Sequence, residues 1–246
     1  MFDVRTVADI VTRMANRTGT RTNDWAIIIL IAVFLAVVYT KVTGQSISPV
    51  PQPTTTALVS LGAIPVRERV TVAGYQRGCG TGQACSFGPA WIDDTDAPGG
   101  RDGCGTRDDV LAAQLTHVVK KGSCVVVSGT LADPYTGKTV QFTKANASTV
   151  AVDHVVPLAY AWDMGAAEWP QARRNTFAND EAINLLAVSG PANSSKSDKG
   201  PAGYMPAAAY ACAYAARWVT VATTYNLSIT PADKQTLTST LAGCPA

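Results

Sequence analysis

Histidine is scarce in this sequence, and cysteine is missing from its first 78 residues. The 246 residues hold two histidines, His117 and His154, and the cysteines begin only at Cys79. The formal net charge is +2, so the chain does not coat nucleic acid through overall charge, and any attraction to phosphate must be local. No C-x-x-C pair is present, which disfavours zinc. The length suits one ordinary core, or one domain with a tail.

Charge is also absent from residues 25–40, a run rich in Ile, Leu, Val and Ala. At about 1.5 Å per residue this run nearly crosses a hydrocarbon core of about 30 Å, and Lys41 can reach the interface. Four arginines precede the run, so the positive-inside rule places the N-terminus in the cytoplasm. We expect a transmembrane signal anchor at 25–42. A cleaved signal peptide and a buried core helix are the alternatives, although no clear cleavage site lies near Lys41.

The remaining sequence is then expected to lie outside the cytoplasm. Residues 1–24 read as a cytoplasmic tail, and residues 43–57 as an extended linker because they are rich in Pro, Ser and Thr. Residues 58–246 read as one extracytoplasmic domain. Its six cysteines indicate a disulfide framework, which persists in oxidising compartments.

Local patterns predict the elements of this domain. Thr106 is a helix N-cap candidate with Asp109 in the capping-box position, and an apolar face continues to Lys120-Lys121-Gly122. Pro231 after Thr230 starts another helix. We expect helices at 106–121, 207–224 and 231–243, a hairpin of 124–129 with 138–143, and a strand at 150–154.

These elements predict how the cysteines pair. If the last two helices are antiparallel, Cys212 near the start of one meets Cys244 just after the end of the other. A second disulfide would tether the helix at 106–121 to the strand that follows it, and the third follows by elimination. The expected pairs are Cys212–Cys244, Cys104–Cys124 and Cys79–Cys85.

One constellation of residues carries chemistry. Asp153-His154 ends an apolar run, Asn184 opens a second one, and Asn193-Ser-Ser-Lys196 follows nine residues beyond Asn184. A neutral imidazole exists at physiological pH and can take a proton from water. A carboxylate and an amide oxygen suit Mg²⁺, Mn²⁺ or Ca²⁺ better than zinc. The pattern indicates metal-assisted cleavage of a phosphodiester.

Each residue receives a role in this hypothesis. His154 is the general base, Asp153 and Asn193 hold the metal, and Asn184 orients His154 or the backbone around it. Positive charge for the phosphate is expected from four residues: Arg173, Arg174, Lys196 and Lys199.

Plainer interpretations stand beside these roles. Asp153-His154 can be a strand end without metal, Asn184 a turn residue, Asn193 a helix cap, and the arginine pair a solvated face. On the helix expected at 106–121, His117 is interpreted as a structural residue. The order and spacing of the constellation favour the chemical interpretation.

Six segments resemble the HNH endonucleases of exported actinobacterial proteins, and are similar to the C-terminal nuclease domain of the GmrSD restriction enzymes. The resemblance runs from Leu58 to Cys244. It is carried by Cys104-Gly-Thr-Arg-Asp-Asp-Val-Leu111, Ser128-Gly-Thr-Leu-Ala-Asp-Pro-Tyr-Thr-Gly137, Val152-Asp-His-Val-Val-Pro-Leu-Ala-Tyr-Ala-Trp162, Phe177-Ala-Asn-Asp180, Asn184-Leu-Leu-Ala-Val188 and Asn193-Ser-Ser-Lys196.

The resemblance implies an α+β fold with a ββα-metal (HNH, His-Me finger) core, elaborated by extra helices and a small β-sheet. It implies His154 as base, Asp153 as metal ligand and Asn184 as the middle asparagine, with Asn193 in place of the usual final histidine. We expect a monomeric, Mg²⁺-dependent endonuclease that contacts the DNA backbone with little sequence preference, membrane-anchored or secreted. The alternatives are an RNase and a binding module of the cell envelope on a degenerate nuclease scaffold.

Overall fold

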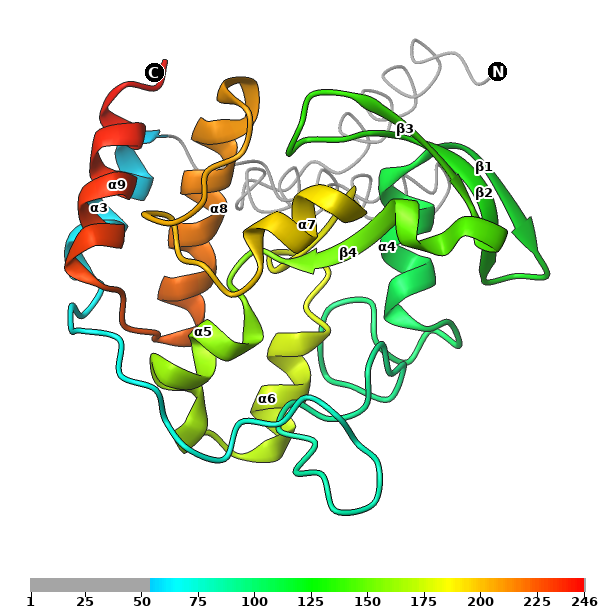
Figure 1. The fold of residues 1–246 in the computed structure, drawn as a ribbon, viewed down its shortest axis with the longest axis horizontal. Coiled ribbons are helices and arrows are strands. Elements are labelled where there is room, and N and C mark those ends of the chain that lie inside the picture. The colour runs from blue at the N-terminus through cyan, green and yellow to red at the C-terminus, as the bar shows by residue number, and fades with distance from the viewer. Residues whose placement is uncertain (1–53, 246) are drawn as a thin grey trace, which may run out of the picture. The chain divides into compact units, whose positions relative to one another are not determined.

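A helix that belongs to the core opens the described part of the chain. The structure is a computed structural model that describes residues 54–245 (Figure 1). The expected tail at 1–24, the apolar segment at 25–42 and most of the linker lie outside these residues. Helix α3 (Thr54–Ala63) buries Ala57 and Leu61. It therefore includes the last residues of the expected linker, and the domain begins before residue 58. Within residues 54–245, no helix combines the length and apolarity needed to cross a membrane.

The domain has a mixed α+β fold, and the candidate site is built on a two-stranded antiparallel sheet. Strands β4 (Val150–His154) and β5 (Leu185–Ser189) pair so that His154 lies opposite Leu185. Helix α7 (Gly190–Lys196) follows β5 directly and contacts both strands. Figure 1 shows α7 lying along β4.

Two hydrophobic clusters sandwich this sheet. Leu186 and Val188 of β5 belong to one cluster, whereas Leu185 and Ala187 belong to the other. Successive side chains of a strand point to opposite faces, so the uninterrupted apolar run of β5 is a strand buried on both sides. The same alternation sends Asp153 and His154 to opposite faces of β4.

The first cluster is mainly helical. Between β4 and β5 the chain forms α5 (Leu158–Asp163), the 3₁₀ turn η2 (Ala166–Glu168) and α6 (Gln171–Ala178). Two longer helices, α8 (Ala208–Tyr225) and α9 (Pro231–Ala242), pack with α3. The Thr230 hydroxyl accepts from the backbone N–H of Asp233, which confirms the expected cap of α9.

The second cluster lies under a three-stranded antiparallel sheet of β1 (Thr116–Lys121), β2 (Val125–Ala132) and β3 (Thr139–Thr143), in that order. The antiparallel pairing of β2 with β3 confirms the expected hairpin. The turn η1 (Lys144–Thr149) leads from β3 to β4.

The helix expected at 106–121 is only half correct. Helix α4 (Thr106–Gln114) ends where Leu115 becomes extended, and Gly105 rather than Thr106 is its N-cap. Residues 116–121 form β1, which includes β-branched Thr116, Val118 and Val119. Pairing with β2 outweighs the helical apolar spacing here.

Three disulfides join the pairs expected from the sequence: Cys79–Cys85, Cys104–Cys124 and Cys212–Cys244. The last one ties α8 to the chain just after α9. Cys104–Cys124 ties the chain two residues before α4 to the residue before β2. Cys79–Cys85 closes a short loop ahead of the first sheet.

Substitution by alanine is expected to have opposite effects on stability at two glycines. A Cβ on Gly190, the first residue of α7, would lie 1.9 Å from the carbonyl oxygen of Ser148, whereas a Cβ on Gly62 of α3 meets nothing within 4 Å. Gly190→Ala should destabilise the fold by about 3 kcal/mol through the backbone clash. Gly62→Ala should stabilise it by about 0.5–1 kcal/mol through helix propensity. Urea unfolding of both variants measures the difference, and equal effects would contradict the packing of α7 against η1.

Candidate active site

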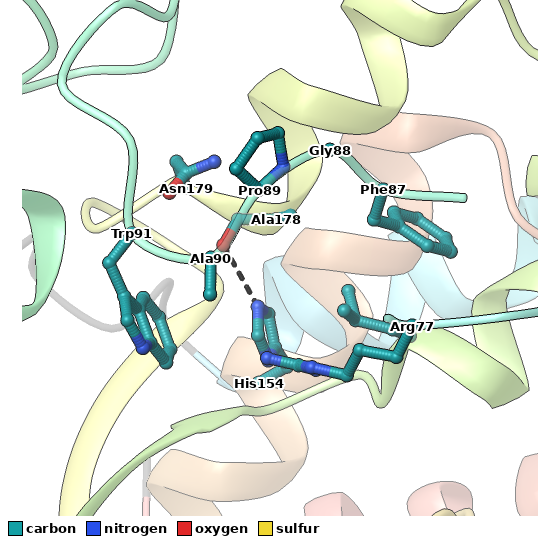
Figure 2. A pocket seen from close by; sticks show the side chains of 10 residues that line it. Arg77, Phe87, Gly88, Pro89, Ala90, Trp91, His154, Ala178 and Asn179 are labelled. Carbon is teal, nitrogen blue, oxygen red and sulfur yellow. Dashed lines mark hydrogen bonds between the residues drawn. The ribbon is translucent and has the colours of Figure 1, made fainter. Parts of the chain in front are cut away.

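His154 lies at the end of β4 with its imidazole held from one side. Its Nε2 is 2.8 Å from the carbonyl oxygen of Ala178, the last residue of α6, as the dashed line in Figure 2 shows. A carbonyl only accepts, so Nε2 donates and carries the proton. In the neutral ring, Nδ1 is then the atom with a free lone pair.

The surroundings keep this ring neutral. Burial lowers the pKa of His154 to about 3, and the positive charge of Arg77 acts in the same direction. An uncharged imidazole is the form that can accept a proton. His154 is 6% exposed, so solvent still reaches part of the residue.

Trp91 covers one face of the imidazole. The two rings are nearly parallel, with an interplanar angle of 12° and centroids 5.6 Å apart. Trp91 has a φ of 60°, a left-handed conformation that bulky residues rarely adopt and that costs about 1–3 kcal/mol. The loop around residue 91 therefore accepts strain while stacking an aromatic ring on His154.

Asp153 is the centre of a buried hydrogen-bond network. Its carboxylate accepts from the Tyr135 hydroxyl at 2.6 Å and from Lys196 Nζ at 3.1 Å, and it forms an ion pair with that ammonium group. A second hydrogen bond of Lys196 goes to the carbonyl oxygen of His154 at 2.8 Å. Burial raises the pKa of Asp153, and the Lys196 and Tyr135 contacts oppose that rise.

Lys196 therefore differs from its expected role. Its side chain is fully buried, and its ammonium group donates to Asp153 and to the His154 carbonyl. An ammonium group in this position cannot reach a phosphate in solvent. The sequence spacing places Lys196 on the side of α7 that faces β4. There its ammonium group pairs with the Asp153 carboxylate instead of a phosphate.

Asn184 shapes the chain that follows His154. Its side-chain oxygen accepts from the backbone N–H of Val156 at 3.0 Å, and its amide donates to the carbonyl oxygen of Phe177 at 3.1 Å. The carbonyl of Asn184 also accepts from the N–H of Val155. Asn184 thus joins the segment after β4 to the end of α6, and it holds the backbone that follows His154.

A solvent-open cleft borders these residues. Its volume is about 400 Å³, and its walls include Asp153, His154, Asn193 and Arg77. Ligand pockets typically measure about 300–1,000 Å³, so a small ligand fits here. The Asn193 side chain forms no hydrogen bond with any residue between 54 and 245. The cleft therefore brings together three of the predicted site residues and one that the sequence did not indicate.

The two expected arginines lie elsewhere. Arg173 donates to the Tyr225 carbonyl at 2.8 Å and stacks on Trp169, whereas Arg174 donates to the carbonyls of Ser86 and Trp169. These contacts tie α6 to its neighbours. Lys199 is exposed and donates to the Ser195 carbonyl at 2.6 Å. None of the three lines the cleft.

Sequence reasoning missed Arg77 and Trp91. Trp91 lies in a stretch rich in Gly, Asp and Pro, and Arg77 lies just ahead of that stretch. A large aromatic residue in such a stretch is a usable signal, because binding residues concentrate on loops. Figure 2 shows Trp91 and Arg77 on two sides of His154.

A second acidic group lies close to Cys104. A carboxylate oxygen of Asp102, a carboxylate oxygen of Asp109 and the sulfur of Cys104 lie close enough to one another to contact one metal ion. Cys104 is disulfide-bonded, so no thiolate is available, and only the two carboxylates remain. Neither Asp153 nor His154 belongs to this group.

The comparisons with known proteins identify the family of the chain. The family profile of GmrSD restriction endonucleases, C-terminal domain, matches residues 105–240, which is more than half of the chain. The chain belongs to this family. The matched region contains Asp153, His154, Asn184 and Asn193, whereas Arg77 precedes it.

A relative of nearly the same length is known from Arthroderma benhamiae. It is described as an uncharacterized secreted protein and is 37% identical over 218 residues, which cover 86% of this chain and 98% of that protein. No solved structure matches the chain. Neither match bears on an actinobacterial origin.

The buried ion pair predicts a large effect of Lys196→Met. This change leaves the Asp153 carboxylate buried without its counter-charge and should destabilise the fold by about 3–5 kcal/mol. Lys199→Met is the matched control, expected within about 0.5 kcal/mol of the wild type because Lys199 is exposed. Adding Asp153→Asn to Lys196→Met should restore part of the loss. Denaturant unfolding measures all four proteins, and an unchanged Lys196→Met midpoint would contradict the pairing.

Glu181 predicts a pH dependence of stability. Burial and the charges of Asp109 and Asp102 raise its pKa from 4.5 to about 7. The folded state therefore binds more protons than the unfolded state, and the stability present below pH 4.5 declines as the pH rises through 7.

Glu181→Gln removes this loss. After discounting for its partial exposure, we expect about 1 kcal/mol of extra stability at pH 8, or about 2–4 °C in Tm, and no gain at pH 4. Exposed Glu68 supplies the control, Glu68→Gln, which should leave Tm unchanged at both values. If Glu181→Gln also raised Tm at pH 4, the ionised form of Glu181 would not be the cause of the gain in stability.

Proposed function

We propose that this protein is a metal-dependent endonuclease that hydrolyses DNA phosphodiester bonds, with His154 as the general base. The observation that carries the proposal is the hydrogen bond from His154 Nε2 to the Ala178 carbonyl, since it leaves Nδ1 free to accept a proton from water. Family membership supports the reaction class. The order β4, β5, α7 supports a ββα-metal arrangement of the site.

The donors present fit a divalent cation. One lone pair of Asp153 Oδ1 is left after the Lys196 contact, because each carboxylate oxygen offers about two acceptor positions. Asn193 adds an amide oxygen on the same cleft. Two oxygen donors plus water suit Mg²⁺, with Mn²⁺ or Ca²⁺ as substitutes. The ion would polarise the phosphoryl group and neutralise the leaving oxygen.

The chain's own residues supply the remaining steps. His154 takes the proton from the attacking water, and Asn184 fixes the backbone that carries the imidazole. In the free protein the low pKa of His154 makes its imidazole a weak base. The negative charge of a bound phosphate raises the pKa of His154. Substrate binding thus strengthens the base that acts on it.

We place the activity outside the cytoplasm. The three disulfides are typical of an oxidising compartment, and the relative with 37% identity is described as secreted. Contacts through the phosphate backbone imply little sequence preference, and a monomer is sufficient because one chain holds every site residue.

The decisive experiment compares the two histidines. His154→Ala should lower the rate of plasmid nicking by about 100-fold to 10,000-fold, since general-base catalysis contributes that much. His117→Ala is the matched control and should keep wild-type activity, because His117 is exposed on β1. EDTA should abolish cleavage by the wild type, and added Mg²⁺ should restore it.

Cleavage by His154→Ala at the wild-type rate would sink the proposal. Preferential cleavage of RNA in a parallel assay would change the substrate but keep the mechanism. Absence of cleavage of any nucleic acid with Mg²⁺, Mn²⁺ or Ca²⁺ would favour a binding module on this scaffold.

A further inference from the structure

Arg77 is a cation on the cleft without a neutralising partner. Arg69, Arg101 and Lys196 pair with carboxylates, and Arg107 and Arg217 donate to backbone carbonyls. Across residues 54–245, Arg77 forms no ion pair. Its one side-chain partner there is the neutral hydroxyl of Tyr75.

The position of Arg77 relative to His154 is specific. Arg77 and His154 together line the open cleft and a smaller hollow beside it, whose wall includes Trp91. Figure 2 shows the Arg77 side chain extending toward the imidazole. An exposed cation that faces a buried neutral base creates a local attraction for an anion.

The loop that carries Arg77 is rigid by construction. The Cys79–Cys85 disulfide closes it, and the N–H groups of Cys85 and Ser86 donate to the carbonyls of Gly78 and Gln76. Such cross-links remove most of the freedom that the loop would otherwise have. Arg77 lies between Gln76 and Gly78, whose carbonyls accept these two hydrogen bonds, so its backbone is held at the base of the closed loop.

Helix α6 anchors the same loop. Arg174 Nε donates to the Ser86 carbonyl at 2.5 Å, and Gln171 Nε2 donates to the carbonyls of Cys85 and Ser86. The Arg174 guanidinium also stacks on Trp162. Since α6 ends at the carbonyl that holds His154, one helix positions both the imidazole and the loop of Arg77.

We propose that Arg77 binds the scissile phosphate and that the Cys79–Cys85 loop and Arg174 position it. This inference rests on the proposed function. A guanidinium donates two parallel hydrogen bonds to non-bridging phosphate oxygens and stays charged at all working pH values. The substrate site thus extends beyond residues 105–240, the region that matches the family, into the segment ahead of it.

The test uses substitutions of Arg77 in the purified full chain, with Arg101→Ala as the control for loss of an exposed arginine. Arg77→Ala should lower kcat/KM for a DNA oligonucleotide by about 100-fold. Arg77→Lys should recover part of this loss, and Arg77→Glu should be worse than Arg77→Ala because it repels phosphate. Arg101→Ala should match the wild type.

A second variant tests the loop. Replacing Cys79 and Cys85 together by Ser should raise KM more than it lowers kcat, because a looser loop presents Arg77 less often. Free ethylguanidinium should partly rescue Arg77→Ala but not the double cysteine variant. A purely structural role of Arg77 would show neither rescue nor dependence on the sign of the charge.

The two proposals fail separately. If His154→Ala is inactive while Arg77→Ala and Arg77→Glu keep wild-type kcat/KM, the nuclease function stands and the role of Arg77 is overturned. If the wild type cleaves nothing, the proposed function fails. Fluorescence anisotropy with the same oligonucleotide then decides the role of Arg77: equal affinity of wild type and Arg77→Glu overturns it, and weaker binding by Arg77→Glu supports it.

Discussion

The structure of the site depends on the buried ion pair between Lys196 and Asp153. Burying two charges costs several kcal/mol for each, and only complete hydrogen bonding repays that cost. Lys196 contacts both oxygens of Asp153 and donates a further hydrogen bond to the His154 carbonyl. The pair locks α7 onto β4, and Tyr135 adds the turn between β2 and β3 to the same network.

This network fixes what the cleft can offer to a ligand. In the proposed metal site, Asp153 already accepts hydrogen bonds from Lys196 and Tyr135, so a cation would take its further ligands from Asn193 and water. Such a site fits an ion that keeps much of its hydration, as Mg²⁺ does.

Sequence patterns predicted the parts of the fold that local chemistry decides. The cap of α9, the hairpin of β2 and β3, and the diverging side chains of Asp153 and His154 each follow from neighbours in the chain. Tertiary pairing decided the rest. Residues 116–121 have helical apolar spacing, yet β2 supplies a strand partner, and pairing of β-branched residues prevails.

The candidate site shows the same division. Spacing along the chain correctly brought Asp153, His154 and Asn193 to one cleft, and it gave Asn184 a role in orienting the backbone. Spacing along the chain did not show which cations face the cleft, because an arginine or lysine near a motif can pair equally well with many different groups. Lys196 and Arg174 found a carboxylate and backbone carbonyls instead of solvent.

Arg174 and Lys196, which we expected to contact phosphate, instead order the main chain around the site. Arg174 holds the loop on which Arg77 lies, and Lys196 holds the strand on which His154 lies. Both are buried or half-buried charges whose hydrogen bonds are directed at backbone carbonyls, so they fix the course of the main chain. A side chain that contacts substrate must leave its own donors free, and a side chain that orders the backbone must use them. The number of donors already used therefore separates Arg77 from the other cations near the motif, and sequence alone does not contain that number.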